Sequence, residues 1–241
     1  MTALFVQFYP KSPSCYFFLL PLLLVSSVTS AQEEKTEAFK VKYENKTDYL
    51  GIGLLKLNYH KYPRVDVFMD PELTLRYDEL RDGGANMEIY PKFYELDYGI
   101  YDFVCLEITE AYYKIEAGAS GIKYVKASEA WTFTSWQDLI ERSFGVSRKA
   151  AWRGTNPLRS EKSEDSPEVP FEPKRFDQFC VIRLEGDWIK VKYDCLYGTD
   201  EFDAFGGQPC ANYIDKCEEG KTGWIRWRYG SDLLIQIFLR P

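Results

Sequence analysis

Histidine and methionine are scarce in this chain of 241 residues, which contains one His and three Met. A catalytic Cys-His pair would have to use His60, which lies in the strand-like run LNYHKYP and which we interpret as an exposed or half-buried strand residue. The sequence contains no glycine-rich phosphate-binding loop, and its acidic run GTDEFDAFGG lacks the ligand spacing of an EF-hand. We therefore expect a protein that is not an enzyme, with no catalytic residues, no bound metal and no cofactor.

Basic charge is also low. The formal net charge is −7, and Lys11 is the only charged residue among the first 31, so the remaining chain carries 29 basic and 37 acidic residues. A surface that follows nucleic-acid phosphates needs an excess of Lys and Arg, so we expect no nucleic-acid partner. Carboxylates are abundant, and a pair of them could serve a hydrolase of the glycosidase type, which stays open as an alternative.

The chain has one long apolar run, close to its N-terminus. Its sequence, CYFFLLPLLLVSS at residues 15–27, follows Lys11 and precedes the small residues VTSA at 28–31. This order of basic, apolar and small residues predicts a signal peptide over residues 1–31. The run is shorter than the roughly 20 residues of a membrane span, although an uncleaved anchor is the alternative. We expect an exported protein, periplasmic or extracellular, with no stable membrane span after cleavage.

The composition is also not rich in helix-forming residues. Aromatic residues make up 17% of the chain, and they favour strands, so the composition predicts a mainly β fold. Two short helical segments should interrupt the strands. Residues 70–84 have a suitable N-cap in Asp70 and three apolar residues at helical spacing, and residues 134–145 can be capped by Thr134 or Ser135.

Two stretches of the chain repeat one pattern. FVCLEITEAYYKIEAG at residues 103–118 and FCVIRLEGDWIKVKYD at 179–194 each alternate apolar and polar residues on both sides of a short acidic turn, which predicts a β-hairpin. A glycine-led strand follows each hairpin, GIKYVK in the first copy and GWIRWR in the second, and the similar runs WQDLI and SDLLI come next. The shared order of several blocks favours duplication into two similar domains over chance similarity of two β segments.

The second copy carries a G-x-W-x-K-V hairpin and a later G-W-I strand. The residues of these motifs are Gly186, Trp188, Lys190 and Val191, then Gly223, Trp224 and Ile225. They resemble the motifs of bacterial SH3-like (SH3b) domains. The resemblance implies two small SH3-like β-barrels with short helical segments: a divergent one at residues 32–148, with an N-terminal extension, and a second at 149–241. In the first copy Tyr112 takes the place of the hairpin Trp.

Two further segments distinguish the second copy. Residues 154–175 are rich in proline and in alternating charge, which predicts an interdomain linker or a long mobile loop where little can be buried. Residues 195–222 lie between the hairpin and the glycine-led strand of the second copy. They form an insertion, because only two residues lie at this place in the first copy.

Five cysteines follow the predicted signal peptide, and in an exported chain they can oxidise. The disulfide candidates in the insertion are Cys195, Cys210 and Cys217. The base of the insertion could bring Cys195 and Cys217 together, and Cys210 could pair with either of them. Their spacing lacks the C-x₂-C pattern of zinc sites. Cys180 is predicted to be a core thiol on the same strand face as Ile182.

The aromatic and basic strand GWIRWRYG offers a binding surface. Trp224 and Trp227 are separated by two residues and point to opposite faces of an ideal strand, so one should be core and the other nearer the surface. The candidate ligand-binding residues are Trp188, Tyr193, Trp224, Arg226 and Arg228. The SH3b resemblance implies that such a patch binds peptides or wall polymers. We expect a binding module for a peptide, peptidoglycan or an envelope partner protein, with an envelope hydrolase or a purely structural envelope component as alternatives.

Overall fold

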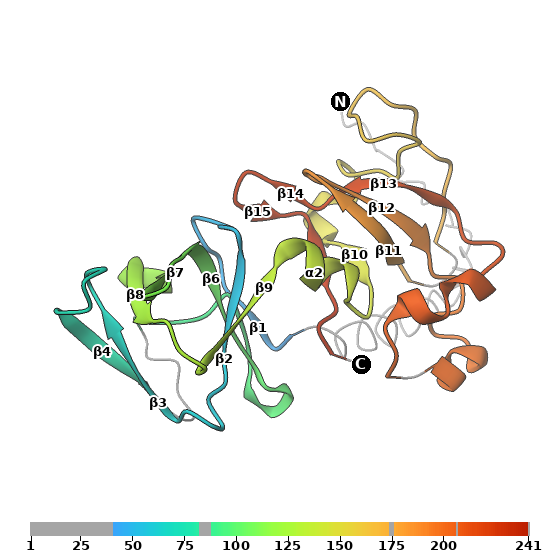
Figure 1. The fold of residues 1–241 in the computed structure, drawn as a ribbon. Coiled ribbons are helices and arrows are strands. Elements are labelled where there is room, and N and C mark those ends of the chain that lie inside the picture. The colour runs from blue at the N-terminus through green and yellow to red at the C-terminus, as the bar shows by residue number, and fades with distance from the viewer. Residues whose placement is uncertain (1–40, 82–87, 174–175, 206, 241) are drawn as a thin grey trace, which may run out of the picture.

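The computed structural model describes residues 41–81, 88–173, 176–205 and 207–240 (Figure 1). The predicted signal peptide lies outside these residues. The described chain is mainly β, as predicted, and is built from two large antiparallel sheets with one short α-helix between them. Neither sheet closes into a barrel in this part of the chain. Among the described residues, no helix is both long enough and apolar enough to cross a membrane.

The first sheet has nine strands. They are β1 (Tyr43–Glu44), β2 (Gly53–Leu57), β3 (Arg64–Phe68), β4 (Arg76–Arg81), β5 (Phe93–Glu95), β6 (Ile100–Ile108), β7 (Tyr112–Glu116), β8 (Ile122–Lys126) and β9 (Trp131–Ser135). Their order is β1-β5-β6-β7-β8-β3-β4, and β2 pairs with both β6 and β9.

The second sheet has five strands in the order β13-β12-β11-β10-β16. They are β10 (Val146–Arg148), β11 (Gln178–Glu185), β12 (Trp188–Tyr193), β13 (Thr222–Arg226) and β16 (Ile235–Ile237). A small hairpin of β14 (Arg228–Tyr229) and β15 (Asp232–Leu233) stands between β13 and β16. Strand β10 belongs to the residues assigned above to the first domain, yet it pairs with β11 and β16.

Five strands of each sheet share one arrangement. The neighbours β9-β2-β6-β7-β8 in the first sheet match β16-β10-β11-β12-β13 in the second. The hairpin registers agree as well, since Val104 pairs with Glu116 and Cys180 pairs with Lys192, 76 positions further along in both strands. Each hairpin also has a bulge at the same place, after Cys105 in β6 and after Val181 in β11.

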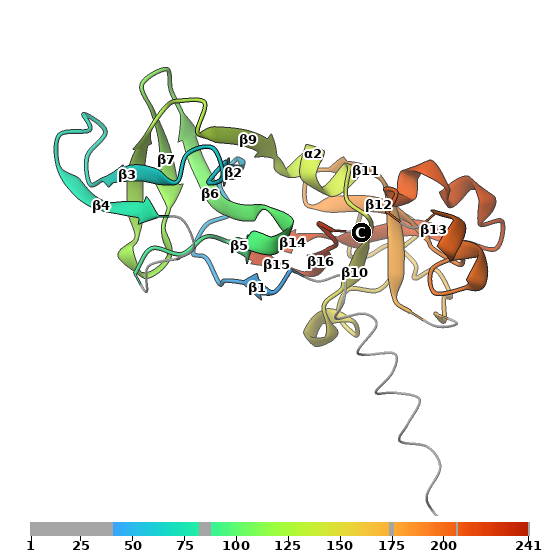
Figure 2. The same ribbon diagram turned by 90° about the horizontal axis from the view of Figure 1, so that it is seen from below.

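Helix α2 (Trp136–Glu141) confirms the second predicted helical segment. The Ser135 hydroxyl accepts a hydrogen bond from the Asp138 backbone N–H at 3.1 Å, which satisfies one of the donors left open at a helix start. The Trp136 indole Nε1 donates to the Leu50 carbonyl oxygen at 2.6 Å, and its ring lies 5.7 Å from that of Trp227. The helix thus links the two sheets (Figure 2). The similar runs WQDLI and SDLLI differ in structure, because the first lies in α2 and the second contains β15 and the first residue of β16.

One hydrophobic core is shared by both sheets. Leu54 and Val104 from the first sheet belong to the same buried cluster as Val146, Phe179 and Ile225 from the second. A separate cluster fills the opposite face of the first sheet, around Phe103, Cys105 and Ile115. The sheets are therefore packed on each other and are not separated by a linker.

The helix predicted over residues 70–84 is wrong for its described part. The chain forms a β3–β4 hairpin there, and β4 occupies residues 76–81. The Asp70 carboxylate accepts hydrogen bonds from the backbone N–H groups of Thr74 and Leu75, at 3.0 and 2.6 Å, so it caps a turn. Leu73 has a positive φ of 57°, and this left-handed conformation cannot continue a right-handed α-helix. The stability gained when β4 pairs with β3 outweighs the local helix preference indicated by three apolar residues at helical spacing.

Residues 154–173 form a long irregular segment, as expected of a loop, but the expectation that little of it can be buried is wrong. Arg159 exchanges two backbone hydrogen bonds of 2.8 Å with Trp224 of β13, so the segment covers the outer edge of the second sheet. A second limb folds back, because the Val169 N–H donates to the Leu158 carbonyl at 2.7 Å. Leu158 is buried in the shared core, and Phe171 packs against it.

Candidate functional site

The second sheet has an inner and an outer face. Ile189, Val191 and Ile225 point into the shared core, so their neighbours in β12 and β13 point outward. Across the strands, Trp188 pairs with Arg226. The outer face therefore gathers the side chains that alternate with the core residues, and two different structures occupy its two ends.

The insertion at residues 195–222 covers one end of the outer face (Figure 1, orange). Its Leu196, Tyr213 and Ile214 form a small buried cluster with Cys180 of β11. Short 3₁₀ turns replace regular helices in this segment, and Cys210 begins one of them.

Two disulfides fix the insertion to the sheet. Cys195 bonds to Cys217, which is one of the pairings left open by the sequence, and Cys210 bonds to Cys180. The prediction of a core thiol at Cys180 is wrong. The bulge between Val181 and Arg183 shifts the alternation of β11, so Cys180 faces outward towards the insertion. The free cysteine of the described chain, Cys105, is buried.

A buried carboxylate also holds the base of the insertion. Asp194 accepts hydrogen bonds from the backbone N–H groups of Leu196 and Tyr197, both at 3.1 Å, and from the Tyr213 hydroxyl at 2.8 Å. Burial raises the pKa of Asp194, and these hydrogen bonds oppose that effect. Burial likewise raises the pKa of the Tyr213 hydroxyl. We interpret this arrangement as structural, because its polar groups are already hydrogen-bonded to the Asp194 carboxylate.

The other end of the outer face is partly covered by the 154–173 segment, which contributes Lys162 and Glu164, and it carries stacked arginines. We call it the Trp188 face and define it as Arg183, Glu185, Trp188, Lys190, Trp224, Arg226 and Tyr229. The Arg226 guanidinium lies 5.4 Å from the Trp188 ring centroid and 5.3 Å from that of Tyr229. The Arg183 guanidinium lies 5.3 Å from the Trp224 ring. Such stacks orient the guanidinium while leaving its N–H edge available for hydrogen bonds.

Asn156 positions Arg226 through the backbone. The Asn156 amide donates to the Arg226 carbonyl at 2.8 Å, and its oxygen accepts from the Arg226 N–H at 2.9 Å. Glu164 forms an ion pair with the Arg226 guanidinium, and the Glu164 side chain is 66% exposed. The buried Nε of Arg226 has no hydrogen-bond partner within the described chain. The carboxylate of Glu164, in an exposed loop, thus already binds the Arg226 guanidinium.

The charge of the Trp188 face is positive although the whole chain is acidic. The face holds three basic side chains and one acidic side chain, Glu185. Glu185 forms an ion pair with Arg183 at 2.7 Å and a hydrogen bond with Lys162, and the Lys162 bond lowers the pKa of that carboxyl. The Trp188 face is therefore suited to an anionic ligand.

The predicted ligand-binding residues are not all on this face. Trp188, Trp224 and Arg226 lie on it, although only 6% of Trp224 is exposed. Tyr193 points into the core, with its ring 4.7 Å from that of Phe171. Arg228 lies beyond the end of β13, where it stacks on Trp227 at 4.8 Å and pairs with Asp187 at 2.6 Å.

Sequence reasoning missed Arg183, Tyr229 and Asn156. The bulge in β11 places Arg183 on the same outer face as Cys180, three positions away, which strict alternation does not allow. Tyr229 directly follows the aromatic and basic strand and is 63% exposed, a position that the composition of GWIRWRYG could have suggested.

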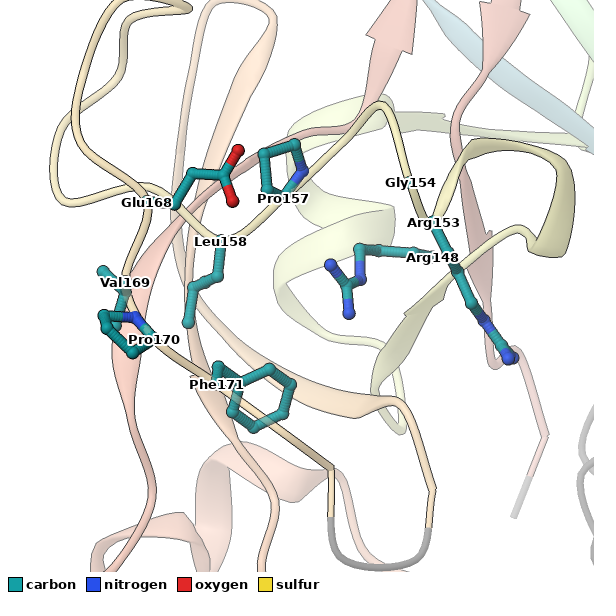
Figure 3. A pocket seen from close by; sticks show the side chains of 9 residues that line it. All are labelled: Arg148, Arg153, Gly154, Pro157, Leu158, Glu168, Val169, Pro170 and Phe171. Carbon is teal, nitrogen blue, oxygen red and sulfur yellow. The ribbon is translucent and has the colours of Figure 1, made fainter.

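A pocket of about 420 Å³ lies between the two limbs of the 154–173 segment and Arg148 of β10. Figure 3 shows the Leu158 and Phe171 side chains on one side of it and Arg148 on the other. Arg148 makes two charged hydrogen bonds to Asp177, from Nη2 to Oδ1 at 2.7 Å and from Nε to Oδ2 at 3.0 Å. Asp177 already neutralises Arg148, so this pocket is better suited to contact an apolar group than to bind an anion.

Comparison of the chain with protein-family models, with curated proteins and with solved structures gives no match.

Proposed function

We propose that this chain is an exported, non-catalytic binding protein that recognises an acidic peptide segment of an envelope partner through the Trp188 face. The observation that carries the proposal is the position of Arg226 between Trp188 and Tyr229, on a partly exposed sheet face with a surplus of positive charge. Stacked arginines next to aromatic rings are frequent at the centres of protein interfaces.

The ion pair between Glu164 and Arg226 indicates how a ligand would bind. A carboxylate from an exposed, surface-loop residue already occupies the edge of the guanidinium. A ligand carboxylate would displace Glu164, whose exposed pairing contributes little stability. Its neighbouring side chains would then lie on Trp188 and Tyr229.

The two five-strand units support a repeated SH3-like origin for the fold. We propose this from their shared strand order, registers and bulge positions, together with the motif resemblance of the second copy. The register places Tyr112 and Lys126 of the first unit where Trp188 and Arg226 lie in the second. The Tyr112 hydroxyl bonds to Glu107 at 3.2 Å and its ring packs on Tyr124, so the first unit has no equivalent arginine stack at this position.

Export is supported by the two disulfides, because such bonds persist in oxidising compartments. The predicted signal peptide agrees with them. A location in the periplasm or outside the cell would bring the Trp188 face into contact with envelope proteins.

Binding of short peptides to purified residues 32–241 tests the function. A ten-residue peptide of alternating Glu and Ala should quench tryptophan fluorescence saturably, whereas the equivalent Lys peptide should not. Because charge-assisted hydrogen bonds contribute about 1.5–3 kcal/mol, Arg226→Gln should weaken binding by about tenfold or more. The matched control is Lys126→Gln in the first unit, which should leave binding unchanged.

Four results would contradict the proposal. Equal binding of the acidic and basic peptides, or equal losses of affinity in both variants, would show that the Trp188 face does not recognise the peptide. Retention on isolated peptidoglycan without any peptide binding would assign the ligand to the wall polymer. Robust hydrolysis of an envelope substrate would make the protein an enzyme.

A further inference from the structure

A second pocket, separate from the Trp188 face, lies where the two sheets meet. We call it the junction pocket; its volume is about 360 Å³. Residues 44–47 and Lys92 line it from the first sheet, and Lys149, Trp152 and residues 231–233 line it from the second. In Figures 1 and 2 the β14–β15 hairpin, which supplies residues 232–233, lies between the two sheets.

Two lysines in this pocket share one carboxylate. Lys149 Nζ donates to Glu44 Oε1 at 2.7 Å, and Lys92 Nζ lies 3.4 Å from the same oxygen. Only 5% of the Lys92 side chain is exposed, and burial lowers its pKa; Glu44 opposes this effect and Lys149 adds to it. The pocket lining contains the ammonium groups of Lys46, Lys92 and Lys149 and the carboxylates of Glu44 and Asp232, so one positive charge is in excess.

A hydroxyl in the same pocket lacks a partner. Thr47 lines the pocket and is 5% exposed, and its Oγ1 is buried with no hydrogen bond to any described residue. Buried hydroxyls are normally hydrogen-bonded, and leaving one unpaired costs about 1–3 kcal/mol. The Thr47 hydroxyl can donate a hydrogen bond to a ligand oxygen.

The segment that carries Thr47 is held in place from both ends. The Asn45 N–H donates to the Lys92 carbonyl at 2.8 Å, and Lys92 Nζ donates to the Asn45 carbonyl at 2.7 Å. The Glu116 carboxylate accepts hydrogen bonds from the backbone N–H groups of Asp48 and Tyr49, at 2.6 and 3.0 Å. A site fixed in this way loses little conformational entropy when it binds a ligand.

We propose that the junction pocket binds a small ligand through an oxyanion group, carboxylate, phosphate or sulfate, held by Lys92, Lys149 and the Thr47 hydroxyl. The bound group neutralises the excess ammonium charge and satisfies the unpaired hydroxyl. Trp152 is partly exposed at the pocket and provides a flat apolar wall for the rest of a small organic ligand. Because the contacts come from both sheets, occupancy stabilises the junction between them.

Thermal unfolding of residues 32–241 with inorganic phosphate, sulfate or acetate, each against chloride at equal ionic strength, tests the site. We expect at least one oxyanion to raise the Tm saturably. The anion that is most effective identifies whether phosphate, sulfate or carboxylate is the preferred group.

Matched variants separate the pocket from general salt effects. Thr47→Val removes only the unpaired hydroxyl, so it should not lower the Tm of the anion-free protein, and it should weaken the apparent Kd by about tenfold. Lys149→Gln should weaken it by at least as much. Thr132→Val, on the exposed strand β9, should bind like the unchanged protein.

Two results would overturn the inference. One is a Tm that rises equally with chloride and with every oxyanion. The other is an apparent Kd that Thr47→Val and Lys149→Gln leave unchanged, because the anion would then bind outside the junction pocket.

Discussion

Replacing Asp102 with Asn should stabilise the protein at neutral and alkaline pH and should have no effect in acid. Asp102 lies on β6 between Ile100 and Val104, two residues of the shared core, and its Oδ1 has no hydrogen-bond partner in the described chain. Burial raises the pKa of Asp102 from its ordinary 3.8 to about 6, and nearby Lys56 only partly offsets this.

The sign and size of the effect follow from this pKa. The folded state binds the proton more tightly than the unfolded state, so the contribution of Asp102 to stability is greatest below pH 3.8 and is lost as the pH rises through about 6. Each pH unit between the two values corresponds to about 1.4 kcal/mol, so the loss amounts to about 3 kcal/mol above pH 7. Asn resembles the protonated acid and does not ionise, so the variant avoids this loss.

Urea unfolding between pH 3 and pH 8 measures the prediction. The difference in unfolding free energy between Asp102→Asn and the unchanged protein should grow from near zero at pH 3 to about 3 kcal/mol at pH 8. The exposed Asp215 is the matched control, and its Asn variant should follow the unchanged protein at every pH. A difference that is constant with pH, or a variant that is less stable at pH 8, would refute the burial of an uncompensated carboxylate at this position.

Three further changes test the fold. Trp136→Ala should lower the unfolding free energy by about 3–5 kcal/mol, measured by urea unfolding, because it removes the ring that links the two sheets; a loss below 1 kcal/mol would contradict a shared core. Replacing both Cys180 and Cys210 with Ser should cost about 3.5 kcal/mol, since their disulfide closes a separation of 30 residues, and mass spectrometry of the unreduced protein should find this pairing and not Cys210–Cys217. Ser135→Ala should cost about 1 kcal/mol of thermal stability by removing the cap of α2, and an unchanged Tm would speak against that cap.

Local patterns in the sequence were sufficient for the hairpins and for α2. The alternation on both sides of the acidic turns fixes which residues of β6–β7 and β11–β12 pair, and Ser135 marks the start of the helix. These features depend on neighbours within about ten residues, so pattern and turn chemistry predict them.

The remaining features depend on contacts between distant residues. The bulge after Val181 places Cys180 and Arg183 on the same outer face of β11, and no local pattern marks its position. The hairpin at β3–β4 replaced the expected helix because pairing with β3 and packing of Leu80 outweigh local spacing. Segment 154–173 looked like a linker because its composition is polar, yet a few apolar residues, Leu158 among them, suffice to attach it to the core.

Tyr193 shows a related limit of sequence reasoning. It shares a strand with Trp188, but the two are five positions apart and therefore face opposite sides of β12. The predicted patch combined them because both are aromatic. Assigning faces along the strand would have separated the core residue from the surface residue.

The central claim is that the outer face of the second unit, and not its counterpart in the first, binds an acidic peptide. Hydrogen exchange of residues 32–241, measured by mass spectrometry with and without the alternating Glu and Ala peptide, tests it most directly. The account predicts slower exchange in peptides covering residues 183–190 and 224–229, with no change in the matching residues 107–114 and 122–126. Protection of the first unit alone, or equal protection of both units, would contradict it.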